Sequence, residues 1–288
     1  MIWEILFEPF AAYGFMRRAL IGCVAISVGA TPIGVFLMLR RMSLTGDAMA
    51  HAILPGAAVG YLIAGLSLTA MTVGGLIAGM AVALFSGFVA RATPLREDAS
   101  LAAFYLISLA AGVLIVSMRG SNVDLMHVLF GTVLALDDAA LILLCAIASV
   151  TVLVLAVLFR PLVMECADPQ FLRSVSGLSA LTHFTFLALA VLNLVGGFHA
   201  LGTLMIVGIM ILPAAAARFW ATTIGGMMAV AILIAIGSSV AGLLLSYHHS
   251  LPSGPAIILS AGVGYILSLV LGPVGGLARG LPNTNANA

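Results

Sequence analysis

Charged side chains are scarce in this sequence, and lysine is absent. Only 7% of the 288 residues are charged, and the eleven basic residues are all arginine. Soluble globular domains carry about 25% charged residues, whereas 63% of this chain is hydrophobic. A water-soluble fold cannot bury that much apolar surface. The composition therefore predicts a polytopic membrane protein, and a net charge of +1 argues against a nucleic-acid partner.

Cysteine clusters and enzyme motifs are also missing. Cys23, Cys145 and Cys166 are widely spaced, which indicates neither a cysteine zinc site nor a disulfide framework. The metalloprotease and serine-hydrolase motifs are not found, nor is a phosphate-binding loop ending in Gly-Lys. We therefore expect no enzymatic activity and no bound cofactor in this chain. If ATP drives its activity, the ATPase must be another chain.

The intervals between charges predict an all-α transmembrane helical bundle of eight to nine spans. A span needs roughly 20 apolar residues. Single spans are expected in residues 19–39, 99–118 and 139–159, and two spans each in residues 48–90, 174–217 and 219–278. These give nine spans. Eight remain possible if one of the breaks, near Gly65, Gly197 or Pro252, marks a re-entrant or kinked segment.

The arginines predict the orientation, because they are more frequent on the cytoplasmic side of a membrane. With nine spans and the C-terminus inside, eight arginines lie inside, and Arg17, Arg18 and Arg119 lie outside. Residues 1–18 are then expected to form an outer interfacial segment. Residues 19–278 form the transmembrane domain.

Two hydrophilic segments follow from this arrangement. Residues 160–177 are expected on the cytoplasmic face as a short helix, with Asp168 as its cap, Pro169 at its first position and Gly177 at its end. A partner could dock there, or the segment could be an ordinary amphipathic loop helix. Residues 279–288 are expected to be a disordered tail.

Asp47 and His51 are the most informative polar residues. They lie four residues apart, about one helical turn, so a carboxylate and an imidazole share one helix face. Residues 48–90, which follow Asp47, carry no formal charge. Such a pair can bind a divalent metal, because imidazole suits zinc and carboxylate also suits manganese. A buried hydrogen bond and a proton relay are the alternatives.

The span count places Asp47 near the cytoplasmic start of the second span, whereas a substrate site is expected nearer mid-membrane. We expect a helix break at Gly46 to carry the pair inward; otherwise the pair guards the inner end of the path. His199, His248 and His249 fall in predicted outer turns. They could guide a metal to the entrance or be ordinary exposed histidines. His183 is expected to be a packing residue.

Several ordered motifs resemble the permease subunits of zinc and manganese ABC importers. They lie in five blocks that run in family order over about residues 5 to 275. The blocks are Leu39 to Gly56 around Gly46-Asp47-Ala48-Met49-Ala50-His51, Leu129 to Leu134, Asp168 to Phe171, Ile211 to Arg218, and Ser246 to Pro255.

This resemblance implies a type II ABC-importer-like permease in the bacterial inner membrane. It implies a homodimer that pairs with two cytoplasmic ATPase subunits, which bind the ATP, and receives metal from an extracytoplasmic binding protein. It also implies that Asp47 and His51 lie on the metal path. The ATPase-contacting coupling helix would span residues 165–177. The coupling residues are then Asp168, Pro169, Gln170, Phe171 and Arg173, with Gln170 standing where the family often has an acid.

The function expected from this resemblance is ATP-driven import of a divalent transition metal by alternating access. Several histidines near the entrance favour Zn²⁺, with Mn²⁺ next. One alternative is a secondary metal transporter that needs no ATPase. The other is an ABC permease of the same architecture for a chelated or organic substrate.

Overall fold

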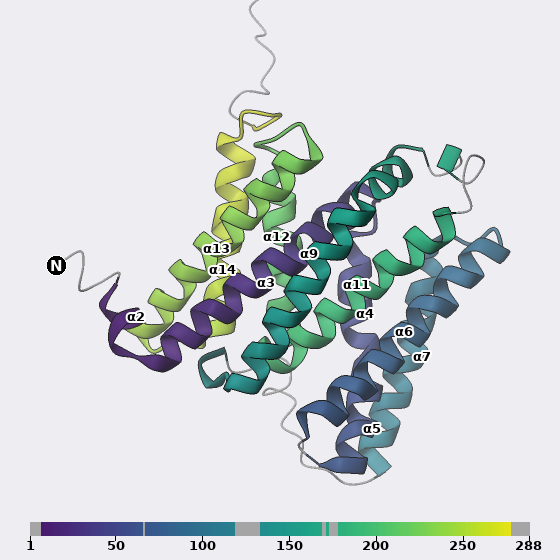
Figure 1. Cartoon of the computed structure of the whole chain (residues 1–288), viewed down its shortest axis with the longest axis horizontal. Helices are drawn as coiled ribbons and strands as arrows, with labels where there is room; N and C mark the ends of the chain where they lie inside the picture. Colours follow the sequence, from purple (N-terminus) through teal and green to yellow (C-terminus); the bar gives the residue numbers. More distant parts are fainter. Residues whose placement is uncertain (1–6, 66, 119–132, 169–170, 173–177, 278–288) are drawn as a thin grey trace, which may run out of the picture.

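The computed structural model describes residues 7–65, 67–118, 133–168, 171–172 and 178–277. Within these ranges the chain is helical and contains no strand (Figure 1). The elements are α2 (Glu8–Ala12), α3 (Gly14–Leu39), α4 (Ser43–Ala52), α5 (Leu54–Ala64), α6 (Leu68–Ala92), α7 (Glu97–Met118), the 3-10 turn η1 (Val133–Ala135), α9 (Asp138–Ala167), α11 (Leu178–Leu201), α12 (Thr203–Ala217), α13 (Ile224–His249) and α14 (Ser253–Leu271). This confirms the all-α fold class.

Eight described segments are long and apolar enough to cross a bilayer, with α4 and α5 together forming one of them. Helix α12 is apolar but has only 15 residues, a length of about 22 Å. The hydrocarbon core is about 30 Å thick. Length and composition alone therefore support the lower of the two expected counts.

Two ion pairs fix the relative direction of α3 and α9. Arg18 contacts Asp138 where both helices begin, with 3.2 Å between Nη1 and Oδ1. Arg40 contacts Glu165 where both helices end, with 3.3 Å between Nη2 and Oε1. The two helices are therefore parallel and lie side by side (Figure 1), as the predicted first and fifth spans should be.

Contacts further along the chain show that α12 also passes between the two faces. His183, early in α11, contacts Arg40. Helix α11 therefore starts at the end of the bundle where Arg40 lies, called here the Arg40 face, and ends at the opposite face. The Tyr247 ring lies 5.7 Å from the Tyr13 ring, so α13 ends at that opposite face and starts at the Arg40 face. Helix α12 joins α11 to α13 and must make the return pass. The described residues thus make nine passes, one of them short.

Some helix boundaries differ from the charge-free intervals. Helix α3 starts at Gly14, not residue 19, and carries Arg17 and Arg18 in its first turns. Helix α9 continues through Arg160 and Pro161 to Ala167, so residues 160–167 belong to a span helix. Its 30 residues measure about 45 Å, which is longer than the membrane core. An arginine near a helix end does not stop the helix, because its long side chain reaches the interface.

Helix α3 lies at the centre of the fold, between the α12–α14 group and the α9–α11 group (Figure 1). Most of its apolar stretch is buried inside the chain. Ile33, Phe36 and Leu37 have no exposed surface. The rings of Phe159 and Phe186 each pack edge-on against Phe36, at 6.2 Å between centroids. This packing holds the end of α3 between α9 and α11.

Glycines let α5 and α6 pack at backbone distance. A Cβ atom on Gly56 would collide with the Gly74 carbonyl, and one on Gly60 would collide with the Ala70 carbonyl. Small residues at helix contacts are the usual means of close packing within membranes. Close packing of α5 against α6 therefore requires glycine, which has no Cβ atom, at these two positions.

We predict that Gly56→Ala lowers the stability of the protein by roughly 1–3 kcal/mol, because the added methyl group forces the two helices apart. Thermal unfolding of the detergent-solubilised protein measures this change. Gly262→Ala is the matched control, since a Cβ there meets no atom within 4 Å. An equal loss of stability in both variants would contradict the assignment of Gly56 to a packing contact.

Candidate functional site

The turn between α3 and α4 fixes where the Asp47 helix begins. Arg41 has a left-handed backbone, with φ 58°. Its N–H donates to the Met38 carbonyl at 3.1 Å, and the Met42 N–H donates to the Leu37 carbonyl at 2.8 Å. These two bonds form a Schellman turn, and Met42 is buried. Helix α4 therefore starts at Ser43 in a fixed relation to the end of α3.

One side of α4 is buried against neighbouring helices. Ala48, Met49 and Ala52 are buried, and Gly46 leaves room for the Met210 side chain of α12. The expected helix break at Gly46 is therefore wrong: Gly46 is a packing position inside α4. The interruption comes at Ile53, just before Pro55, because proline has no N–H to continue the helical hydrogen bonds.

The other side of α4 is left uncovered by the described part of the chain. Leu44 is 79% exposed, and the side chains of Asp47 and His51 are 62% and 32% exposed. The three residues follow an i, i+3, i+7 spacing, which places them on one helix face. A carboxylate facing lipid is costly. This face therefore requires water or another chain beside it.

The geometry of Asp47 and His51 does not match a buried hydrogen bond. The His51 Nε2 and Asp47 Oδ1 atoms are 3.8 Å apart, beyond the usual limit of about 3.2 Å for such a bond. The Tyr105 ring lies 6.5 Å from the His51 ring. Both side chains belong to the uncovered face, and neither is held by a close hydrogen bond to the other. In the described ranges, no third His, Cys, Asp or Glu joins them in a metal-binding group.

The other candidate histidines lie on helices and not in turns. His199 is in the last turn of α11, which continues until Gly202 adopts φ 84°. His248 and His249 are exposed in the last turn of α13, which ends at the left-handed Ser250. The last two histidines lie at the face opposite Arg40. Neither of these two is grouped with Asp47 and His51 where the structure is described.

The predicted coupling segment is described only in part. The Asp168 Oδ1 atom accepts a hydrogen bond from the Phe171 N–H at 2.9 Å, so Asp168 caps a turn as the sequence predicts. Phe171 is exposed, whereas Leu172 is buried. Pro169, Gln170 and Arg173 lie outside the described residues, so their predicted contacts with an ATPase stay predictions.

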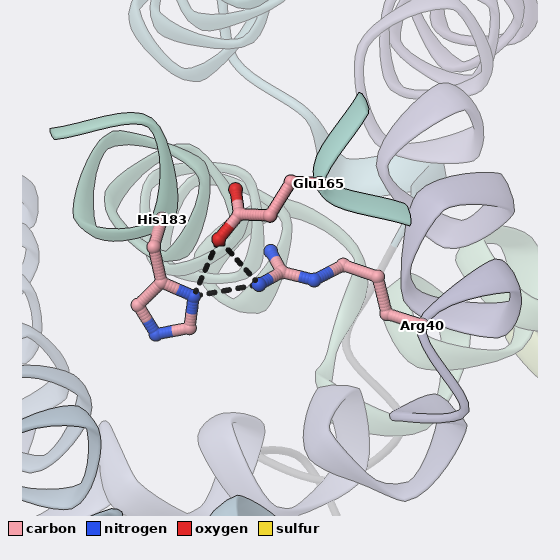
Figure 2. A network of polar contacts seen from close by, with 3 residues as sticks. All are labelled: Arg40, Glu165 and His183. Atoms are coloured by element: carbon pink, nitrogen blue, oxygen red, sulfur yellow. Dashed lines mark hydrogen bonds and ion pairs between the residues drawn. The ribbon is translucent and has the colours of Figure 1, made fainter. Parts of the chain in front are cut away.

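A buried polar cluster of Arg40, Glu165 and His183 was not anticipated from the sequence (Figure 2). The Arg40 Nη2 atom lies 3.3 Å from Glu165 Oε1 and 2.6 Å from His183 Nδ1. The side chains are only 9%, 4% and 5% exposed, respectively. The sequence contained one indication of this cluster, because each residue is an ionisable group near the predicted cytoplasmic end of an apolar segment. Which of these groups pair depends on which helices are neighbours, and hydrophobic periodicity does not show that.

Comparisons with known proteins agree over nearly the full length. Residues 12–272 match the model of the "ABC 3 transport family". The manganese import system permease protein ScaB of Streptococcus parasanguinis is 30% identical over 95% of this chain and 96% of its own length. The chelated iron transport system membrane protein YfeD of Yersinia pestis is 27% identical over 94% of this chain and 89% of its own.

The fold is also similar to a solved structure. A chain of PsaBC from Streptococcus pneumoniae, in complex with Fab, superposes with a TM-score of 0.82 at 27% identity. The match covers 96% of this chain and 98% of that chain. The likeness therefore extends over nearly the whole chain and is not restricted to one motif.

We predict that Asp47→Asn leaves the stability of the protein within about 0.5 kcal/mol of the parent, because the side chain is exposed and makes no close hydrogen bond. Thermal unfolding in detergent measures this. A loss of several kcal/mol would show that Asp47 is part of a buried polar pair, contrary to the geometry of α4.

Proposed function

The chain belongs to the ABC 3 transport family, as a multi-pass permease of a metal importer, and on that premise we propose that it carries Mn²⁺ or a similar divalent ion into the bacterial cytoplasm through Asp47 and His51. The observation that carries this proposal is the uncovered face of α4. It presents a carboxylate and an imidazole on a helix long enough, with α5, to cross the membrane.

A second copy of the chain would supply what one copy does not. The described residues give the pair no third ligand. A two-fold axis beside the uncovered face of α4 would bring two Asp47 and two His51 side chains together. Two carboxylates and two imidazoles are enough for Mn²⁺, Fe²⁺ or Zn²⁺. The dimer would also cover Leu44 and keep Asp47 away from lipid.

We place Mn²⁺ ahead of Zn²⁺ as the transported ion. The preference for zinc drawn from the sequence depended on outer histidines, and two of them, His248 and His249, lie at the face opposite Arg40. The relatives carry names that refer to manganese and iron. A carboxylate–imidazole site binds Zn²⁺ more tightly than Mn²⁺. Selection of Mn²⁺ would therefore depend on how the ion is delivered and released.

The energy for transport would come from partner chains. The sequence has no phosphate-binding loop, so ATP would be bound and hydrolysed by separate cytoplasmic subunits. These would contact the capped segment after α9, where Phe171 is exposed. Metal would arrive from an extracytoplasmic binding protein. Movement of the segment would then alternate the access of Asp47 and His51 between the two faces.

We predict that the double variant Asp47→Ala/His51→Ala lowers ATP-dependent Mn²⁺ uptake at least tenfold, because the ion loses the groups that replace part of its water shell. The assay uses vesicles that contain the permease with its ATPase partner and measures ⁵⁴Mn²⁺ uptake at equal protein levels. Asn193→Ala is not a suitable control, since its amide bonds to Thr151 inside the bundle. Leu259→Ala is suitable, because this exposed side chain lies on α14, away from the uncovered face of α4, and has no ligand atom.

Three outcomes separate the rival functions. Wild-type uptake by an assembled double variant would remove Asp47 and His51 from the path. Uptake that persists without ATP would favour a secondary transporter. Uptake of a metal chelate that is insensitive to the double substitution would favour the alternative that the YfeD name suggests.

We also predict that Zn²⁺ inhibits Mn²⁺ uptake at concentrations well below those of Mn²⁺, because the nitrogen and oxygen ligands hold Zn²⁺ more tightly and release it more slowly. Initial uptake rates at fixed Mn²⁺ and rising Zn²⁺ measure this. Inhibition that needs an excess of Zn²⁺ over Mn²⁺ would contradict a path formed by these ligands.

A further inference from the structure

We propose that Arg40, Glu165 and His183 position helix α4 relative to the coupling segment, so that movement of that segment reaches Asp47 and His51. The inference rests on the proposed function. It assigns to the buried cluster of Figure 2 a role in coupling. The three residues would act through α4 and would not contact the metal.

The cluster joins both flanks of the coupling segment to the start of α4. Glu165 is in the last turn of α9, just before the cap residue Asp168. His183 is early in α11, the helix that follows the segment. Arg40 is the C-cap of α3 and precedes the Schellman turn that fixes the first residue of α4. A single guanidinium group therefore connects the two ends of the segment to the helix that carries the proposed metal pair.

Stability alone gives little reason to bury these charges. A buried ion pair is often no more stabilising than apolar residues of similar size, because desolvation cancels much of the attraction. Apolar packing is already present: Leu162, Phe186 and Leu187 are fully or almost fully buried, and the Arg40 guanidinium stands 5.1 Å from the centre of the Phe186 ring. Ionisable groups inside a membrane bundle usually serve a function.

The ion pair is incomplete in this conformation. Arg40 and Glu165 share one contact, between Nη2 and Oε1 at 3.3 Å. Arg40 Nη1 and Glu165 Oε2 are buried and have no hydrogen-bond partner within the described ranges. Arginine and a carboxylate can form two parallel hydrogen bonds. A small sliding of α9 along α3 would exchange one contact for two, which gives the cluster two discrete arrangements.

His183 holds the guanidinium from the other side. Arginine has only hydrogen-bond donors, so the His183 Nδ1 atom, 2.6 Å from Arg40 Nη2, must be the acceptor. The His183 Nδ1 atom is 3.7 Å from Glu165 Oε1, too far for a hydrogen bond. Within the cluster, Arg40 therefore bridges Glu165 of α9 and His183 of α11, and these two side chains fix its position.

The chain offers a matched control on the same two helices. Arg18 and Asp138 join α3 to α9 at the opposite face, and their side chains are 42% and 81% exposed. This pair has the same residue classes and a similar distance, but it is far from the coupling segment and from α4. If the loss of any ion pair between α3 and α9 lowered coupling, substitution of either pair would lower the amount of Mn²⁺ moved per ATP.

The test measures Mn²⁺ transport and ATP hydrolysis separately in proteoliposomes that contain the permease with its ATPase and binding-protein partners. Glu165→Gln is expected to lower the amount of Mn²⁺ moved per ATP by about tenfold, a typical coupling factor, while ATP hydrolysis stays within about twofold. Arg18→Gln is expected to keep the wild-type ratio. His183→Asn, whose carbonyl oxygen can replace Nδ1 as acceptor, should keep most of the ratio that His183→Phe loses.

A wild-type ratio in Glu165→Gln, or an equal loss in Arg18→Gln, overturns the proposal. If Glu165→Gln does not assemble, Glu165→Asp replaces it, because it keeps the charge and shortens the reach. A lowered ratio in Glu165→Asp then supports the proposal, and a wild-type ratio overturns it. If the wild-type complex moves no Mn²⁺, the proposed function itself fails. If it does, only the coupling role is at stake.

Discussion

The cost of placing an ionisable group inside a membrane governs where polar side chains occur in this protein. The charge of Arg18 is paired with Asp138 at one face, and the charge of Arg40 is paired with Glu165 at the other. Asp47 differs from these, because it belongs to a spanning segment and yet remains 62% exposed beside a His51 that is too distant for a hydrogen bond. A group left in that state needs water, an ion or a second chain beside it.

Close packing around α3 makes that arrangement specific. Its buried residues contact helices from both halves of the chain, and its C-terminal turn sets the start of α4. The small side chain of Gly46 lets α4 pack against Met210. Because one side of α4 is held in this way, the direction in which Asp47 points is fixed by the core and not by the pair itself.

The relation between the Asp47–His51 pair and the segment after α9 also depends on this geometry. Asp47 is far in sequence from Asp168, but Arg40 and Glu165 bring their neighbourhoods into contact. A rigid turn on one side and a capped turn on the other shorten the path between them. The Arg40–Glu165 contact thus connects the turn before α4 to the end of α9.

The sequence by itself determined the membrane-spanning class, the all-helical fold, most span positions and the pairing of Asp47 with His51 on one helix face, because apolar run length and helical periodicity are local properties. It did not determine that α3 begins at Gly14, that the break follows His51 at Ile53, or that α12 crosses with 15 residues. The break at Ile53 follows locally from Pro55, whereas the crossing of α12 depends on which helices touch. The same holds for the Arg40–Glu165–His183 cluster, whose members come from three helices. Only tertiary packing decides which buried charges meet, because these three side chains come within contact distance only when α3, α9 and α11 pack together, and their spacing along the chain does not specify this.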